Sequence, residues 1–199
     1  MKRGTTVLIV VAALLIVVGL SSASAYNGLV ALDQGVTAQW GQVENVYQRR
    51  ADLVPNLVET VKGAASFEKE TMIQVTEARA QVGKLTVGKD VLTDPQAFQK
   101  FQEAQTQLSS ALSRLLVVSE RYPDLKATQN FRDLQAQLEG TENGITVERQ
   151  RFNESAQAFN TKRISFPTTL LAGFFGSRFG EKVYFQALPG AQSVPKVKF

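Results

Sequence analysis

The stretch WGQVENVYQRRADLVPNLVETVKGA, residues 40–64, decides the fold of this chain. Two interleaved sets of its side chains each repeat every seven residues: Trp40, Tyr47, Val54 and Val61, and Val43, Arg50, Leu57 and Ala64. Spacings of three and four that add up to seven are typical of a helix that packs against other helices. The stretch therefore predicts one helix of an all-α bundle.

Two residues disturb this apolar pattern. Arg50 puts a charge on the side of the helix that is expected to be buried, and Pro55 lies inside the helix. Proline has no N–H, and its ring crowds the carbonyl four residues earlier, which is that of Ala51. We therefore expect a helix kink at Pro55.

The surrounding sequence, YNGLVALDQGVTAQWGQVENVYQRRADLVPNLVETVKG (26–63), resembles the signature region of LemA-type membrane proteins. Later segments follow in the expected order: VTEARA (75–80), SRLLVVSERYPDLKA (113–127), FRDLQAQLEGTENGI (131–145), ERQRFNESAQAFN (148–160) and YFQ (184–186). The resemblance implies an N-terminal membrane anchor followed by an antiparallel helical bundle. It implies little about biochemistry, because no reaction or ligand is securely attached to the family.

Residue usage restricts the possible functions. The chain of 199 residues has no Cys and no His. This excludes Ser-His-Asp and Cys-His nucleophile systems, His- or Cys-ligated haem, zinc sites built on those residues, and the Glu-x-x-His di-iron site. The net charge is +4, of which Lys2 and Arg3 supply two, and this leaves too little positive charge for nucleic-acid binding. We identify no catalytic residue, cofactor, metal or small-molecule substrate.

Residues 1–25 are the predicted membrane anchor. No charge occurs between Arg3 and Asp33, and the apolar span of about 21 residues is long enough to cross a bilayer. The alternative is a cleaved signal peptide, because the strongly apolar core (7–20) is short and Ala23-Ser24-Ala25 resembles a cleavage site. The basic end favours a cytoplasmic N-terminus, so we expect the body outside the plasma membrane, periplasmic or extracellular.

Residues 26–164 are the predicted bundle of three or four antiparallel helices. Helices are expected over 26–66, over 68–121 and over 124–164, where Phe131, Leu138, Ile145, Phe152 and Phe159 recur every seven residues. GKLTVGKDVLTDP (83–95) interrupts the second helix, so 68–121 is one interrupted helix or two helices.

The direction of the last helix depends on that choice. If 68–121 makes a single pass, the YPDLK turn (122–126) lies near the membrane and the C-terminal tail lies far from it. If it makes two full antiparallel passes, the helix over 124–164 is reversed. We expect the single pass.

Residues 165–199 have frequent Gly and Pro and no seven-residue repeat, which predicts an irregular tail. We expect a short helix and an extended segment packed on the bundle. The alternative is a surface for a partner or for the membrane. Its aromatic residues are Phe166, Phe174, Phe175 and Phe179.

Several charged residues lie on or beside the helical seams: Arg49, Arg50, Asp52, Glu77, Arg79, Glu120, Glu142, Glu148 and Arg149. We expect a structural polar layer of paired charges, which specify register without a ligand. Its members would be Arg49, Arg50, Asp52, Glu77, Arg79 and Glu148. In the single-pass arrangement Arg50 and Glu148 lie at similar height, which predicts an ion pair between them.

These observations favour a non-enzymatic scaffold or adaptor that is anchored in the membrane of the cell envelope. It would act through self-association, as a homo-oligomer, or through a protein partner. The competing interpretation is an envelope hydrolase that uses carboxylates and arginines, with carboxylates of raised pKa converging in a deep pocket.

Overall fold

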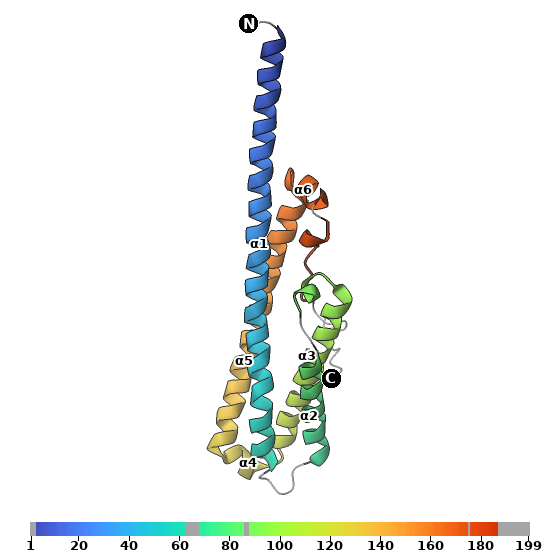
Figure 1. Cartoon of the computed structure of the whole chain (residues 1–199). Coiled ribbons are helices and arrows are strands. Elements are labelled where there is room, and N and C mark those ends of the chain that lie inside the picture. Colours follow the sequence, from blue (N-terminus) through green and yellow to red (C-terminus); the bar gives the residue numbers. More distant parts are fainter. Residues whose placement is uncertain (1–2, 63–67, 86–87, 175, 187–199) are drawn as a thin grey trace, which may run out of the picture.

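The computed structural model describes residues 3–62, 68–85, 88–174 and 176–186. Within these ranges the chain forms helices and no strand, which confirms the all-α prediction. The helices are α1 (Arg3–Lys62), α2 (Lys69–Lys84), α3 (Pro95–Ser119), α4 (Pro123–Ala127), α5 (Gln129–Ile164) and α6 (Thr168–Phe174). Two 3-10 turns, η1 (Lys89–Leu92) and η2 (Gly176–Phe179), complete the elements (Figure 1).

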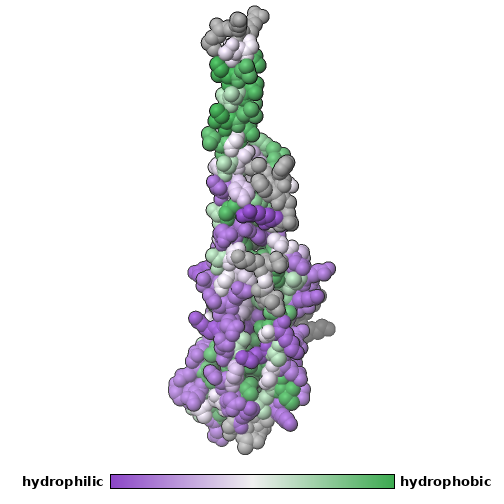
Figure 2. All heavy atoms as spheres, in the orientation of Figure 1, coloured by the Kyte–Doolittle hydropathy of each residue, from purple (hydrophilic) through white to green (hydrophobic). Residues whose placement is uncertain are grey.

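Helix α1 has two parts with different surroundings. Residues 4–21 project beyond the rest of the chain and are fully exposed, and they form the apolar upper part of the surface in Figure 2. From Ala25 onward one side of the helix is buried, including Leu29, Val36 and the predicted seam that starts at Trp40. Helix α1 is long and apolar enough to cross a membrane, with an 18-residue window of mean hydropathy 2.7.

The body consists of two antiparallel helix pairs, α1 with α5 and α2 with α3 (Figure 1). Along the contacts between α1 and α5, the residue numbers rise in α1 while they fall in α5, so the two helices are antiparallel. Gly28 lies against the Lys162 stem, Val46 against Gly144, and Arg50 against Glu142. Helices α2 and α3 pass in opposite directions on either side of the 83–95 interruption, so the expected single pass is wrong.

This reversal moves both ends of α5. Helix α4, which contains the YPDLK turn, lies at the end of the body far from the projecting part of α1 (Figure 1). Helix α6 lies at the opposite end, against α1 and α5. The tail therefore returns toward the predicted membrane side, which is the reverse of the expected placement.

The buried core is divided into two apolar clusters along the bundle. The cluster nearer the projecting part of α1 is aromatic, and the Trp40 ring contacts the rings of Phe98, Phe101, Phe152 and Phe185. The cluster nearer α4 is mostly aliphatic and contains Val54, Leu57, Val61, Leu108, Leu112 and Leu115. Arg50, Gln105 and Thr141 are buried between the two.

Candidate functional site

Arg50 is the centre of the polar layer that separates the two clusters. Its position on the α1 seam buries it to 2% exposure. Nη1 donates to Oε1 of Glu142 on α5 at 2.8 Å. Nη2 donates to the backbone O of Gln105 on α3 at 3.0 Å and to its Oε1 at 2.5 Å. Three helices therefore meet at one guanidinium, whose planar set of donors suits such an arrangement.

An open groove of about 520 Å³ lies over this layer, between α3 and α5 with α1 as its floor. Hydroxyl groups form much of its wall, from Thr106, Ser109, Ser110, Ser113 and Thr146. Ser109 Oγ also reaches Oε1 of Glu142, at 3.4 Å. The groove is thus polar, and a second arginine, Arg149, joins Arg50 in its lining.

The electrostatics of the groove favour an anion. Its lining contains two arginines and Glu142 as the one carboxylate among the described residues. The Nε atoms of Arg50 and Arg149 are buried and have no hydrogen-bond partner among the described residues. Buried donors without a partner are rare and costly, so these two Nε atoms are unusual.

Tyr47 stands beside this arginine pair. The Arg50 guanidinium lies 5.1 Å from the centre of its ring, a cation–π contact. Burial raises the pKa of the Tyr47 phenol, while Arg149 and Arg50 oppose the rise and Glu142 adds to it. The phenol is therefore held in its neutral form.

Pro55 is accommodated inside α1 by a side chain from α2. Because proline lacks an N–H, the carbonyl of Ala51 receives no helical hydrogen bond from position 55. Arg79 Nε donates to this carbonyl at 2.9 Å, and α1 continues unbroken to Lys62. The hydrogen bond that Pro55 cannot make is therefore replaced by one from Arg79, and this contact positions α2 on α1.

The extended segment 180–186 is fixed to α5 by two asparagines seven residues apart. Asn160 donates to the backbone O of Lys182 and accepts from its N, both at 2.8 Å. Asn153 bonds Phe185 in the same two-way manner, at 2.9 and 2.8 Å. The segment thereby places Phe185 against Trp40 and the Arg149 guanidinium.

The sequence profile of the LemA family matches residues 39–199. The chain belongs to the LemA family. It is also similar to two magnetosome proteins of Paramagnetospirillum magneticum, MamQ 1 and MamQ 2, and to MamQ of Magnetospirillum gryphiswaldense. Each is 24% identical to this chain over 84% of it and 67% of the relative.

In this LemA-family protein the segments that carry the resemblance provide several of these contacts. VTEARA provides Arg79, ERQRFNESAQAFN provides Arg149, Asn153 and Asn160, and YFQ provides Phe185. The resemblance is therefore a resemblance of packing contacts between helices. Among the described residues no group of three or more carboxylates is placed to hold a metal ion.

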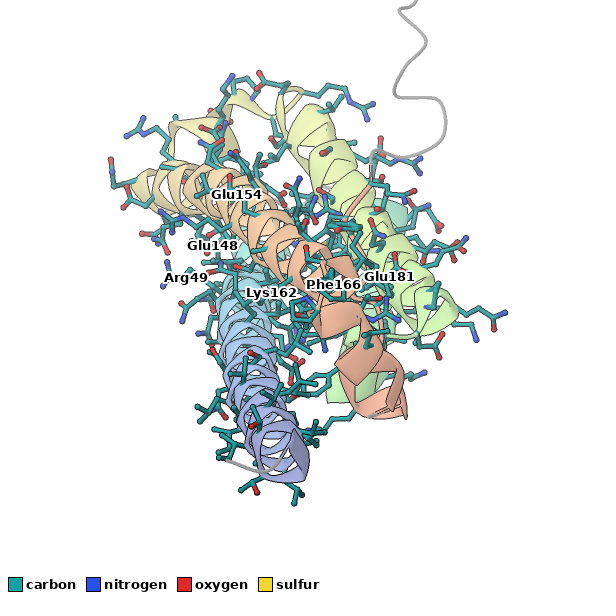
Figure 3. All side chains as sticks on the ribbon, turned by 90° about the horizontal axis from the view of Figure 1, so that it is seen from above. Arg49, Glu148, Glu154, Lys162, Phe166 and Glu181 are labelled. Carbon is teal, nitrogen blue, oxygen red and sulfur yellow. The ribbon has the colours of Figure 1, made fainter. Side chains whose placement is uncertain are left out.

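The expected polar layer is assembled only in part. Arg50 is at its centre. Arg49, Asp52, Glu77 and Arg79 are exposed, and of these Arg79 still donates to the Ala51 carbonyl. Glu148 does not meet Arg50; it accepts from Gln39 at 2.6 Å and pairs with Arg151 at 2.7 Å. Arg49, Asp52 and Glu148 instead line a separate groove on the α1–α5 pair. Figure 3 shows Arg49 and Glu148 on the same side of this pair.

Sequence reasoning missed the residues that complete the layer. Glu142 belonged to the wider set of charged residues but was not assigned to Arg50, and Glu120 pairs with Lys126 at the far end of the molecule. Gln105 lies on the apolar row of α3 between Phe101 and Leu108. A polar side chain on an otherwise apolar row was the available signal for a partner of Arg50.

The four aromatic residues of the tail do not form one surface. Phe179 is 1% exposed and packs its ring on Tyr26 and Phe159, so it belongs to the core. Phe166 is exposed at the junction of α5 and α6. The Phe174 side chain and the whole of Phe175 lie outside the described residues.

Proposed function

We propose that this protein is a non-enzymatic, membrane-anchored scaffold of the cell envelope, which acts through self-association or a protein partner. The observation that carries the proposal is the continuity of α1. One helix of 60 residues contains both the exposed apolar span and the central seam of the bundle. A body built on the same helix as its anchor is held close to the membrane.

The relatives support a structural role. The three MamQ proteins are named for the magnetosome to which they belong, and their names state no reaction. A LemA-family chain with a comparable role would contribute to a membrane assembly. The basic residues Lys2 and Arg3 support a cytoplasmic N-terminus, with the body outside the plasma membrane.

The groove over Arg50 is the position that we propose for a protein partner. Its two arginines have spare buried donors, and its hydroxyl-rich wall supplies further hydrogen bonds. A partner segment with Asp or Glu side chains fits this chemistry, because arginine binds carboxylates through paired N–H donors.

The competing proposal, an envelope hydrolase, has less support. Hydrolysis by carboxylates uses two of them on either side of the bond that is broken. In the groove Glu142 stands alone among the lining residues and is bonded to Arg50. Among the other charged side chains of the helical seams, Arg49, Asp52 and Glu148 line a different groove.

Site-specific photo-crosslinking in native membranes tests the proposal. A photoreactive residue replaces Ser110, which is exposed in the groove, and a matched one replaces Thr76, exposed on α2 outside the groove. We expect discrete crosslinked protein species from position 110 and not from position 76. Mass spectrometry then identifies the partner or a second copy of this chain. Equal crosslinking from both positions, or none from position 110, would contradict the proposal.

A further inference from the structure

The corner between α5 and α6 exposes an unusual group of apolar side chains. Ile164, Phe166 and Leu170 are 67%, 81% and 68% exposed. They lie within a stretch of seven residues: Ile164 ends α5, Phe166 lies in the turn at Ser165–Pro167, and Leu170 lies on α6. Single exposed apolar residues are ordinary, but a contiguous group marks an interaction surface.

This corner lies where α1 leaves the body. Helix α6 contacts both α1 and α5, and the Lys162 stem lies against Gly28 of α1. The Tyr26 ring packs on Phe179 at 5.7 Å between centres. In the view from above, Lys162 lies between α5 and α1, and Phe166 lies at the end of α5 (Figure 3). The corner therefore lies beside α1 at the level of Tyr26 and Gly28, next to the apolar span.

The length of that span brings the membrane surface down to the corner. The exposed apolar part of α1, residues 4–21, is about 27 Å long at about 1.5 Å per residue. The hydrocarbon core of a bilayer is about 30 Å thick. A bilayer around this part of α1 therefore extends close to the first buried residue of the body, Ala25.

The charge pattern of this end also suits a lipid surface. Residues 155–180 contain no acidic side chain and three basic ones, Lys162, Arg163 and Arg178. Arg163 donates to the backbone O of Phe179 at 2.7 Å, and the Arg178 guanidinium lies 5.6 Å from the centre of the Tyr26 ring. Basic groups beside apolar ones are attracted to anionic lipid headgroups.

We propose that the α5–α6 corner is a second membrane contact, in which Ile164, Phe166 and Leu170 enter the lipid interface beside α1. The occupant of this apolar surface is the bilayer that α1 spans, on the side where the body lies. Two contacts fix the tilt and rotation of the bundle, which one helix alone leaves free. The proposal holds for either orientation of the protein and is independent of the partner in the groove.

Depth-dependent fluorescence quenching tests this proposal on the full chain. Because the sequence has no cysteine, Phe166→Cys or Leu170→Cys gives a single thiol for an environment-sensitive fluorophore. The labelled protein is reconstituted in vesicles of phosphatidylcholine with phosphatidylglycerol that carry a nitroxide on the headgroup or on the acyl chain. We expect acyl-chain nitroxides to quench both positions more strongly than headgroup nitroxides do. The control, Lys126→Cys on α4, should be quenched by neither.

Two outcomes would overturn the proposal. One is a probe at position 166 or 170 that responds like the α4 control, which would place the corner in water. The other is a probe that is shielded from lipid nitroxides but quenched by a second labelled copy, which would make the surface a protein–protein contact. Circular dichroism of each labelled variant verifies that the bundle is folded.

Discussion

At the residue scale, Arg50 joins three helices through one buried cation. Removal of one partner from such a group leaves the charge short of hydrogen bonds, and a hydrogen bond to a charged group is worth about 1.5–3 kcal/mol. Glu142 is 37% exposed, so water can replace part of the hydrogen bonding that Arg50 would lose if Glu142 were removed. The relevant comparison is therefore between Glu142 and Glu148, which lies on the same helix but does not touch Arg50.

We expect Glu142→Ala to lower the free energy of unfolding by about 1.5–3 kcal/mol, because Gln105 is then the one hydrogen-bond partner left to Arg50 among the described residues. Glu148→Ala should cost no more than about 1 kcal/mol, since its ion-pair partner Arg151 is exposed. Denaturant titration of the full chain in detergent micelles measures both. Glu142→Gln keeps an acceptor oxygen and serves as the control. The assignment is wrong if Glu148→Ala is the more destabilising change.

Tyr47 gives a pH dependence whose direction follows from its burial. Because the pKa of the phenol is raised in the folded state, the neutral form stabilises the fold. This contribution is complete below the unfolded pKa of about 10 and is lost as pH rises through the folded value. We expect stability to fall above about pH 10 in the parent and to fall less in Tyr47→Phe. The phenolate absorbance of the parent minus that of Tyr47→Phe should show the titration of Tyr47 above pH 10. A midpoint at or below pH 10 would contradict a raised pKa.

The sequence predicted that Arg50 is buried but not which residue pairs with it. Burial follows from the seven-residue repeat, which depends on α1 alone. The partner depends on the direction of α5, because reversing that helix changes which of its residues lies opposite each residue of α1. Glu148 was chosen for a parallel arrangement, and in the antiparallel one Glu142 lies opposite Arg50.

At the element scale, Pro55 and Arg79 form a pair that couples α1 to α2. We expect Arg79→Ala to cost about 1–2 kcal/mol in the parent, because the Ala51 carbonyl loses its donor. In a Pro55→Ala background the helix supplies that donor from its own backbone, so the same change should cost close to nothing. The two unfolding free energies form a double-mutant cycle. Equal losses in both backgrounds would show that Arg79 does not replace the missing helical bond.

The number of passes through the bundle was the element-level question that the sequence left open. Gly83, Gly88 and Pro95 mark a break but do not say whether the chain turns back there. The structure gives α2 16 residues and α3 25, about 24 and 38 Å at about 1.5 Å per residue. Each length is enough for a separate pass, and Asp94 caps a new helix with its side chain. The lengths of the two helical segments were therefore a better guide to the number of passes than the continuity of the apolar spacing across the break.

At the scale of the whole molecule, the aromatic tail was the least predictable part. Residues 180–186 have no periodic pattern, and their position depends on hydrogen bonds from Asn153 and Asn160 to the backbone. Hydrogen bonds from side chains to the backbone do not require particular residues at particular spacings in residues 180–186, so they leave no pattern in that part of the sequence. The apolar span of α1 was predictable for the opposite reason, since length and the absence of charge are visible in the sequence alone.

The central claim is that α1 crosses a membrane and holds the bundle on its outer side. Single cysteines at Leu14, in the exposed apolar part of α1, and at Lys126, on α4, allow one direct measurement in a chain without other thiols. An impermeant thiol reagent is added to intact cells, or to spheroplasts where an outer membrane intervenes. The account predicts that Lys126→Cys is labelled at once and that Leu14→Cys is protected until detergent is added. Labelling of Lys126→Cys only after lysis, or free labelling of Leu14→Cys, would contradict it.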